Sequence, residues 1–336
     1  MTNVSLAFPL DDPELAQNLM AELQIVEAQL QDAVANVHLL ADEASRHLVS
    51  AGGKRLRPLL TLLVSQLGTG VSDEIRKAGV VVELTHLASL YHDDVMDSAP
   101  LRRGAPSAHE VWGNNVAILT GDLLFARASR LTADLGPDAV AVQADTFERL
   151  CMGQLQETVG PTESDDPVAH YIQVLADKTA SLLATSAYFG ARYSGCSVEV
   201  QRTVAQYGEK IGVAFQLADD VIDLTSSGEV TGKTQGTDLR EQVPTMPVLL
   251  LRKRVAQGTA APGDQELIDL IDSDLSSDEA LNHTVSLLKA HPVVEETRAQ
   301  SAQWAQDAIA ELDGLPQGSV RQALAAFAQA LVERSA

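Results

Sequence analysis

The chain has 336 residues, 45% of them hydrophobic and 21% charged, which is the composition of an ordinary globular protein with a sizeable core. This composition excludes a disordered chain, a collagen-like fibre and a bundle of membrane helices. The 46 acidic residues against 24 basic ones give a formal net charge of −22, which repels nucleic acids and anionic membrane surfaces. We therefore expect neither a nucleic-acid partner nor an integral membrane segment.

The sequence also indicates a reducing, cytoplasmic location. Residues Met1 to Asp12 contain no Lys or Arg, unlike a signal peptide, and no uninterrupted apolar run approaches the roughly 18 residues of a membrane span. The two cysteines, Cys151 and Cys196, are too few for a disulfide framework and lie outside any zinc-type cluster. We interpret both cysteines, and Trp112, as packing residues.

Helical signals follow one another along the chain, and no segment has the pattern of a strand. Asp12-Pro13 predicts the start of the first helix, and Ser72-Asp73-Glu74 predicts the start of a long one. The apolar spacing predicts helical regions at 13–51, 58–67, 73–97, 115–135, 138–159, 168–193, 198–224, 247–257, 265–271, 278–290, 294–312 and 319–333. The expected fold class is all-α, a single large helical domain over residues 1–336 in which residues 1–12 are flexible.

Two aspartate clusters give the strongest chemical signal: Asp93-Asp94-Val95-Met96-Asp97 and Asp219-Asp220-Val221-Ile222-Asp223. With 26 Asp in the chain, chance gives roughly 0.15 matches to Asp-Asp-x-x-Asp, so two copies are unexpected. A solvated acidic helix end is the simpler explanation for either cluster alone. Both clusters, however, end apolar helical stretches, where the carbonyl end of a helix disfavours carboxylates without a cationic partner.

The spacing of the clusters favours a divalent metal ion as that partner. Asp93 and Asp97 are four residues apart, as are Asp219 and Asp223, so each pair projects from one face of its helix. Mg²⁺ is a hard ion that binds one or two carboxylates together with water and phosphate oxygens. Two facing helices with such pairs would hold Mg²⁺ on a diphosphate.

Three basic groups suit the same anion. Lys54-Arg55-Leu56-Arg57 follows a glycine pair, Arg102-Arg103-Gly104 follows the first aspartate cluster, and Gly232-Lys233 lies in the connection 225–247. Arg binds phosphate oxygens in pairs, and Lys binds them as a point charge. Each group taken singly would be an exposed charge, but three groups beside the acidic clusters indicate a diphosphate site. The connection itself, about twenty residues with three glycines, has a length typical of functional loops.

With these motifs, the sequence resembles the trans-type polyprenyl diphosphate synthases, the prenyltransferases that elongate a chain head to tail. The resemblance covers nearly the whole chain in motif order and includes Phe215-Gln216 before the second aspartate cluster. It implies a helical fold around a deep central cavity, a homodimer, and Mg²⁺ as the cofactor. The substrates that it implies are isopentenyl diphosphate and an allylic diphosphate, joined without a side-chain nucleophile.

The resemblance also implies roles for individual residues. The diphosphate of isopentenyl diphosphate would bind Lys54, Arg57, His86 and Arg103, and the allylic diphosphate would bind Arg102, Lys178 and Lys233. Thr179 and Gln216 would line the reacting carbons. His86 alone would more often be a core histidine, and its place seven residues before Asp93 favours the substrate contact. The main Mg²⁺ ligands would be Asp93, Asp97 and Asp219, with Asp94, Asp220 and Asp223 as ligands or as residues behind them.

The chain departs from the family pattern after Gly236. Many members have a second lysine near Asp238 and a Glu-Gly-Lys, whereas this chain has Thr237 and Glu241-Gln242-Val243. One or two allylic contacts are therefore missing or are supplied by Arg240.

Other functions stay open at this point. One is a short-chain synthase that makes farnesyl or geranylgeranyl diphosphate, and another is a non-catalytic lipid-diphosphate-binding subunit of a heteromeric synthase. A terpene cyclase would have little use for a second diphosphate site at Lys54, Arg57 and Arg103.

Small side chains on the helix of the first cluster predict a long product. Ala88 and Ser89, about one turn before Asp93, replace the aromatic residue that short-chain members commonly have there. The helix from Asp93 back to Asp73 spans about 30 Å, and each isoprene unit is roughly one helical turn long. We expect an all-trans product of about seven to nine units. Such a product suits a quinone side chain, as in menaquinone, and would be handed to the membrane. Helix 115–135 would form the opposite wall, with Phe125 at its end.

Overall fold

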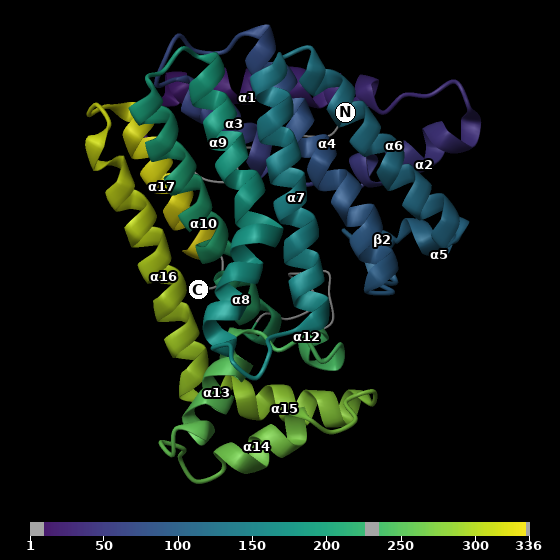
Figure 1. Ribbon diagram of the computed structural model, residues 1–336, viewed down its shortest axis with the longest axis vertical. Coiled ribbons are helices and arrows are strands. Elements are labelled where there is room, and N and C mark those ends of the chain that lie inside the picture. The colour runs from purple at the N-terminus through teal and green to yellow at the C-terminus, as the bar shows by residue number, and fades with distance from the viewer. Residues whose placement is uncertain (1–9, 226–234, 334–336) are drawn as a thin grey trace. The chain divides into compact units, whose positions relative to one another are not determined.

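The computed structural model describes residues 10–225 and 235–333, and these residues are almost entirely helical (Figure 1). The expectation of an all-α fold is confirmed. A π-helix, Ala176–Ala180, joins α8 to α9, and a 3-10 helix, Leu312–Gly314, follows α16. The α-helices are α1 Pro13–Ala33, α2 Leu39–Ser50, α3 Leu56–Ser65, α4 Asp73–Met96, α5 Ala108–Trp112, α6 Asn114–Ala133, α7 Pro137–Val159, α8 Pro167–Leu175, α9 Ser181–Tyr193, α10 Val198–Thr225, α12 Thr237–Arg240, α13 Met246–Ala256, α14 Asp264–Ile271, α15 Asp278–Lys289, α16 Pro292–Glu311 and α17 Ser319–Glu333.

Helix starts follow the polar residues that the sequence offers as caps. The Asp12 carboxylate accepts hydrogen bonds from the backbone N–H groups of Glu14 and Leu15, both at 3.0 Å. Ser72 caps α4 through a bond from the Ile75 N–H at 3.4 Å. Asp12 is therefore fixed at a helix end, while residues 1–9 of the segment expected to be flexible lie outside the described residues.

A small hairpin corrects the expectation that the chain contains no strand. β1, Leu101–Arg102, pairs antiparallel with β2, Ala105–Pro106. Arg103 and Gly104 form the turn with φ of 54° and 77°, and positive φ at both central residues is what a two-residue type I′ turn requires. Two residue pairs are too few to show as an alternating pattern in the sequence, which is why the hairpin was not predicted.

The chain divides into two compact units, which we describe separately. The first unit comprises the residues up to Leu150 together with Ser181–Glu209 and Ile309–Phe327. Its central helix is α4, which packs against α1, α3, α6 and α9. Thirteen of the α4 side chains are buried, from Ile75 to Asp94. The first aspartate cluster thus lies at the C-terminal end of the central helix of this unit.

The second unit comprises Cys151–Ala180, Lys210–Ala308 and the chain from Ala328 onward. Its core joins Leu217 and Val221 of α10 to apolar side chains of α13, α14 and α15. In Figure 1, α13, α14 and α15 lie together at one end of this unit. The second aspartate cluster is at the C-terminal end of α10, directly beside this core.

The π-helix of the second unit is held by two glycines on neighbouring helices. A Cβ on Gly153 of α7 would lie 2.6 Å from the backbone nitrogen of Lys178, and a Cβ on Gly212 of α10 would lie 2.5 Å from the Ala180 Cβ. Both helices therefore pack directly on the π-helical turn. Such turns are frequent at functional sites, and this one carries Lys178 and Thr179.

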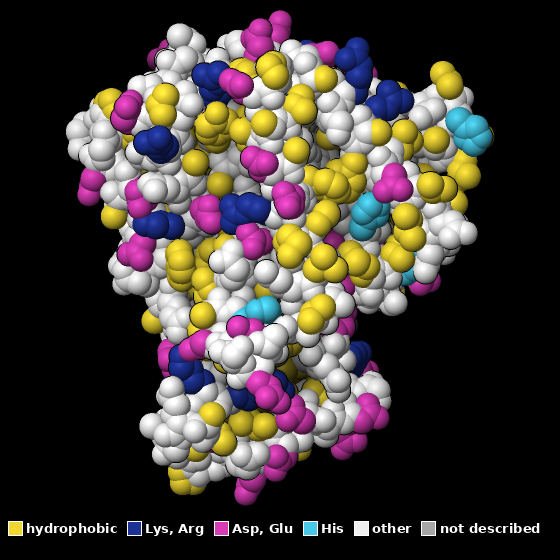
Figure 2. All heavy atoms as spheres, viewed as in Figure 1, with side chains coloured by type: hydrophobic (Ala, Val, Ile, Leu, Met, Phe, Trp, Pro, Cys, Tyr) yellow, Lys and Arg dark blue, Asp and Glu magenta, His cyan; other side chains and the backbone are white. Residues whose placement is uncertain are grey.

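The expectations about membrane spans, surface charge and cysteines can be compared with the structure. No described helix is long and apolar enough to cross a membrane. On the face shown in Figure 2, basic side chains lie singly or in small groups among acidic ones. Cys151 is exposed, so its interpretation as a packing residue was wrong, whereas Cys196 is half-buried. Trp112 packs edge-on against His47, with ring centres 5.1 Å apart.

We predict that Gly212→Ala destabilises the protein by about 1–3 kcal/mol, because the added methyl group overlaps Ala180 and must displace the π-helical turn. Urea denaturation followed by circular dichroism measures this loss. Gly314→Ala is the matched control, since no heavy atom lies within 4 Å of a Cβ built there. Equal stability of the two variants would contradict the predicted overlap.

Candidate active site

A glycine pair positions one arginine of the first unit. Gly53, with φ of 140°, lies so close to Arg103 that a Cβ would be 2.9 Å from its guanidinium carbon. The Arg103 Nη1 donates to the backbone carbonyls of Leu48, at 3.1 Å, and Gly52. The hairpin turn is therefore bound to the loop before α3, and Arg103 comes beside the residues of the Lys54 to Arg57 motif.

Arg57 lies beside Arg103 and has an enclosed donor that is unsatisfied. Burial lowers the pKa of Arg57 to about 10, and the charge of Arg103 contributes to this, while Glu83 opposes it. Within the described part of the chain, no hydrogen-bond partner reaches the buried Nε of Arg57. Burial also lowers the pKa of Arg103. Arg57 and Arg103 are both half-buried, and the Arg57 Nε–H has no acceptor among the described residues. Such a pair of guanidinium groups is suited to bind an anion such as a diphosphate.

His86 belongs to the same group of side chains. Burial and the positive charges of Arg57 and Arg103 lower its pKa well below the ordinary value of 6.5. The imidazole is therefore neutral at neutral pH. A neutral ring offers an N–H donor to an anion without adding a third positive charge to the arginines.

Arg55, in the same motif, faces the protein interior instead. Its side chain is 4% exposed, and it pairs with Glu27 at 2.7 Å and with Glu83 at 2.9 Å. Lys54 is exposed at the surface. The sequence did not separate the inward arginine from the others, although Glu83 within an apolar helical stretch was a signal for a buried cation.

The middle aspartate of the first cluster is turned inward. Asp94 is fully buried and accepts a hydrogen bond from the Arg102 Nε at 2.6 Å. Burial raises the pKa of Asp94, and the charge of Arg102 opposes this rise. Asp93 is half-buried and Asp97 is exposed, so the outer pair is the accessible one. Arg102, expected on the allylic diphosphate, is bound to Asp94 here.

The second cluster has the same arrangement with different partners. Asp220 is buried, and the Tyr171 hydroxyl lies 3.0 Å from both of its carboxylate oxygens. The backbone N–H of Met246 donates to the Asp220 Oδ2 at 3.1 Å. Burial, and then the negative charge of Asp238, raise the pKa of Asp220 well above its usual range, while Met246 and Tyr171 oppose the rise. Asp219 and Asp223 are half-buried.

The donor chemistry of the clusters fits Mg²⁺. Among residues 10–225 and 235–333, no three His, Cys, Asp or Glu side chains are grouped so that they alone hold a metal ion. Mg²⁺ does not need such a cage, because it takes one or two carboxylates and completes its shell with water and phosphate oxygens. Each cluster presents two accessible carboxylates four residues apart, which is a suitable donor set.

The other described residues expected to bind the allylic substrate lie on the π-helix, on α10 and on α12. Lys178 pairs with Glu157, an acidic residue that no sequence motif indicated. Thr179 is buried in the π-helix, and Gln216 is half-buried on α10. Arg240 is bound to Asp278 at 2.5 Å. Lys233 lies outside the described residues.

The side chains along α4 are arranged differently from the expectation in one respect. Ala88 is fully buried, and Ser89 donates to the His86 carbonyl at 2.9 Å. The Phe125 ring lies 5.7 Å from that of His92, next to the first cluster. Phe125 is therefore at the aspartate end of α4, and the expectation that it closes the far end was wrong.

Two further helices pack along α4. Gln143 of α7 donates to the Thr85 hydroxyl at 2.7 Å. Thr85 is eight residues before Asp93, which is about 12 Å along α4. Beyond it, Val82 packs in one cluster with Leu182 and Phe189 of α9. Residues of α7 and α9, as well as α6, thus contact α4.

Comparisons with known proteins identify the family of this chain. A family model described as polyprenyl synthetase matches residues 38–288. A nonaprenyl diphosphate synthase of Mycobacterium tuberculosis is 40% identical over 97% of this chain and 96% of its own length.

Two solved structures are also similar. A Caulobacter crescentus polyprenyl synthase, complexed with calcium and isoprenyl diphosphate, superposes with a TM-score of 0.88 at 31% identity, over 98% of this chain and 99% of its own. A Corynebacterium glutamicum geranylgeranyl pyrophosphate synthase, with the same ligands, has a TM-score of 0.85 at 40% identity, over 97% and 99%. This chain belongs to the polyprenyl synthetase family.

Proposed function

We propose that the protein condenses isopentenyl diphosphate with an allylic diphosphate into an all-trans polyprenyl diphosphate of about seven to nine units. The observation that carries the proposal is the buried Nε donor of Arg57, which lies beside Arg103 and which no described residue satisfies, in a chain with two Asp-Asp-x-x-Asp clusters. The similarity to a nonaprenyl diphosphate synthase supports the long product. The proposal includes a cytoplasmic homodimer that supplies a quinone side chain.

In this proposal, the two diphosphates bind different basic residues. Arg57, Arg103 and neutral His86, together with the exposed Lys54, hold isopentenyl diphosphate. Lys178 and Arg102 hold the allylic diphosphate: Lys178 exchanges its Glu157 partner for the substrate, whereas Arg102 keeps Asp94 and uses its remaining N–H donors. The exchange is favourable only where the substrate brings more negative charge than the carboxylate that it replaces. Lys233 is assigned to this substrate by its motif.

The reaction requires no nucleophilic side chain. Mg²⁺ held by Asp93, Asp97, Asp219 and Asp223 would neutralise the charge that develops on the leaving diphosphate. The carbon–oxygen bond of the allylic substrate breaks, the double bond of isopentenyl diphosphate attacks the allylic cation, and a proton passes to the departing diphosphate. Thr179 and Gln216 orient the reacting carbons, and apolar walls exclude water that would trap the cation.

The similarity to a geranylgeranyl pyrophosphate synthase favours a short product as the second candidate function. Thr85 with Gln143, about 12 Å along α4 from Asp93, would be the floor in that case. The two candidates share one reaction and differ only in where the chain stops growing. Product length therefore decides between them.

We expect purified protein with labelled isopentenyl diphosphate, an allylic primer and Mg²⁺ to make labelled polyprenyl diphosphate. Asp93→Ala and Asp219→Ala should each lower turnover by several orders of magnitude while the protein stays folded, because the leaving group loses its counter-charge. Asp145→Ala, an exposed aspartate of α7, is the control and should keep full activity. Activity that survives EDTA, or full activity in both cluster variants, would contradict the proposal.

We also expect substrate binding to raise the pKa of His86. Without ligand, the imidazole should stay neutral well below pH 6.5, because burial and the two arginines disfavour a further positive charge. Bound isopentenyl diphosphate adds negative charge and should raise the pKa toward its ordinary value. NMR of labelled histidine, assigned with His86→Gln, measures both titrations. A His86 signal that titrates near pH 6.5 without ligand would show that the ring does not face Arg57 and Arg103.

Product length should respond to bulk at the start of the path. Ala88→Phe is expected to shorten the product to about fifteen or twenty carbons, since the ring stands about one helical turn from the reacting end. Ser89→Phe provides a second variant if the buried Ala88 position does not accept a ring. Ala126→Phe, at an exposed position of α6, is the control. A wild-type product of twenty carbons would instead support the short-chain function.

A further inference from the structure

Asp220 is held by residues from two other elements of the second unit. Tyr171 of α8 reaches it with a hydroxyl group, and Met246 reaches it with the first backbone N–H of α13. Both groups donate, and the two carboxyl oxygens of Asp220 accept from them. Through Asp220, the end of α10 is tied to α8 and to α13.

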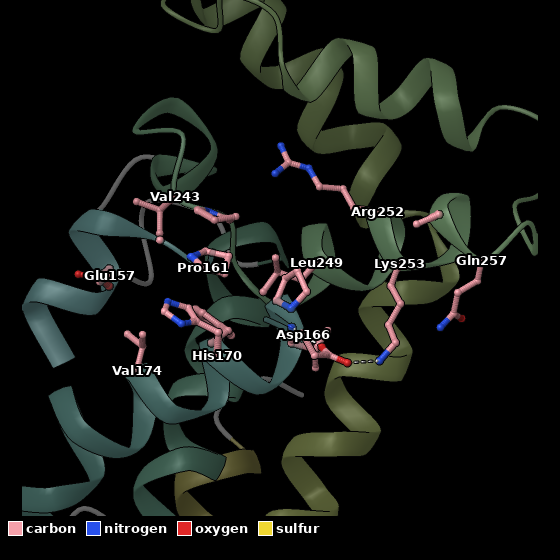
Figure 3. A pocket seen from close by; sticks show the side chains of 16 residues that line it. Glu157, Pro161, Asp166, His170, Val174, Val243, Leu249, Arg252, Lys253 and Gln257 are labelled. Carbon is pink, nitrogen blue, oxygen red and sulfur yellow. Dashed lines mark hydrogen bonds and ion pairs between the residues drawn. The ribbon is translucent and has the colours of Figure 1, made fainter. Parts of the chain in front are cut away.

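The position of Tyr171 is itself fixed. α8 begins at Asp166, whose carboxylate accepts from the N–H groups of Val168 and Ala169 at 2.8 and 3.2 Å. The Tyr171 side chain also lines a cavity of about 450 Å³ between α8 and α13, with Val174, Leu249 and Pro161 among its apolar walls (Figure 3). The Tyr171 hydroxyl thus contacts Asp220, while the ring borders the cavity.

Removal of the hydroxyl group would leave the Asp220 carboxylate with one fewer donor in a buried place. A buried carboxyl group that loses a hydrogen-bond donor either moves or finds another donor. Either response changes the end of α10, where Asp219 and Asp223 project. The hydroxyl therefore acts on the accessible carboxylates without being one of the groups that contact the substrates.

We propose that Tyr171 is a positioning residue, which holds Asp220 and so fixes the direction in which Asp219 and Asp223 present their carboxylates to a divalent cation. The inference rests on the proposed function in one respect, namely that Asp219 and Asp223 bind the metal. It assigns the role to the phenolic oxygen, not to the ring.

The first test removes that oxygen alone. Tyr171→Phe should weaken Mn²⁺ binding about 10- to 100-fold, as is usual when a residue behind a metal ligand is lost. Binding is measured from the EPR signal of free Mn²⁺, with Mn²⁺ alone and with inorganic diphosphate. The KM for isopentenyl diphosphate should stay unchanged, since the residues proposed for it belong to the first unit.

Tyr207→Phe is the matched control for this substitution. Tyr207 is fully buried, and its hydroxyl donates to the Leu324 carbonyl at 2.6 Å, within the first unit. The variant loses the same atom and an equally buried hydrogen bond, so it measures the effect of lower stability alone. Mn²⁺ affinity should be that of the wild-type protein.

The cavity provides a second test by chemical rescue. Tyr171→Ala would join the space of the lost ring to the existing cavity, and phenol added to the solution has the shape and the donor of the missing side chain. Phenol should restore Mn²⁺ affinity, whereas toluene, which fills the space without a donor, should not. If Tyr171→Ala does not fold, the comparison of Tyr171→Phe with Tyr207→Phe decides alone.

Three results would overturn the inference: unchanged Mn²⁺ affinity in Tyr171→Phe, an equal loss in Tyr207→Phe, or rescue by toluene as well as phenol. Failure of the proposed function is recognised separately. In that case Asp219→Ala would bind Mn²⁺ as the wild-type protein does, and the wild-type protein would make no prenyl product.

Discussion

Taking a carboxylate out of water costs several kcal/mol unless the protein supplies hydrogen bonds or an opposite charge. Both aspartate clusters supply such partners at their second residue. The Arg102 guanidinium group donates to Oδ1 of Asp94, and the Tyr171 hydroxyl and the Met246 backbone N–H donate to Asp220. The first and fifth residues of each cluster lie on one helix face and are less buried than the second: Asp97 is exposed, and Asp93, Asp219 and Asp223 are half-buried. The accessible carboxylate pairs thus depend on what the buried residue is bonded to.

The two anchors differ in a way that matters for metal binding. Arg102 carries a positive charge and lies close to a cluster that is to hold a cation, so it competes with that cation in part. Tyr171 is neutral and satisfies Asp220 without reducing the negative charge of the cluster. Burial and the nearby Asp238, however, raise the pKa of Asp220 and so favour its uncharged form.

Local signals in the sequence predicted the parts of the fold that local interactions decide. The caps Asp12 and Ser72 bond to the residues two or three positions ahead, so the starts of α1 and α4 could be read from the sequence. The π-helix could not, because the apolar spacing continues through it and the glycines that hold it, Gly153 and Gly212, come from other helices.

The same limit applies to the site. The clusters and basic motifs were visible as short patterns, but Tyr171 is 49 residues from Asp220 and has no pattern of its own. Nor does the spacing of Arg55 and Arg57 show which of them faces inward. That choice is made by Glu27 and Glu83, 28 residues away on either side of Arg55.

Arg57 and Arg103 form a pair of like charges in a place with little water, and their lowered pKa values express that burial and repulsion. The folded chain retains this unfavourable energy as long as no anion is bound. A multiply charged anion relieves it and binds only the folded form, so ligand binding and folding are coupled. The first unit should therefore gain thermal stability from a small dianion that has no hydrocarbon tail. The basic site thus influences the stability of the folded protein as well as the choice of ligand.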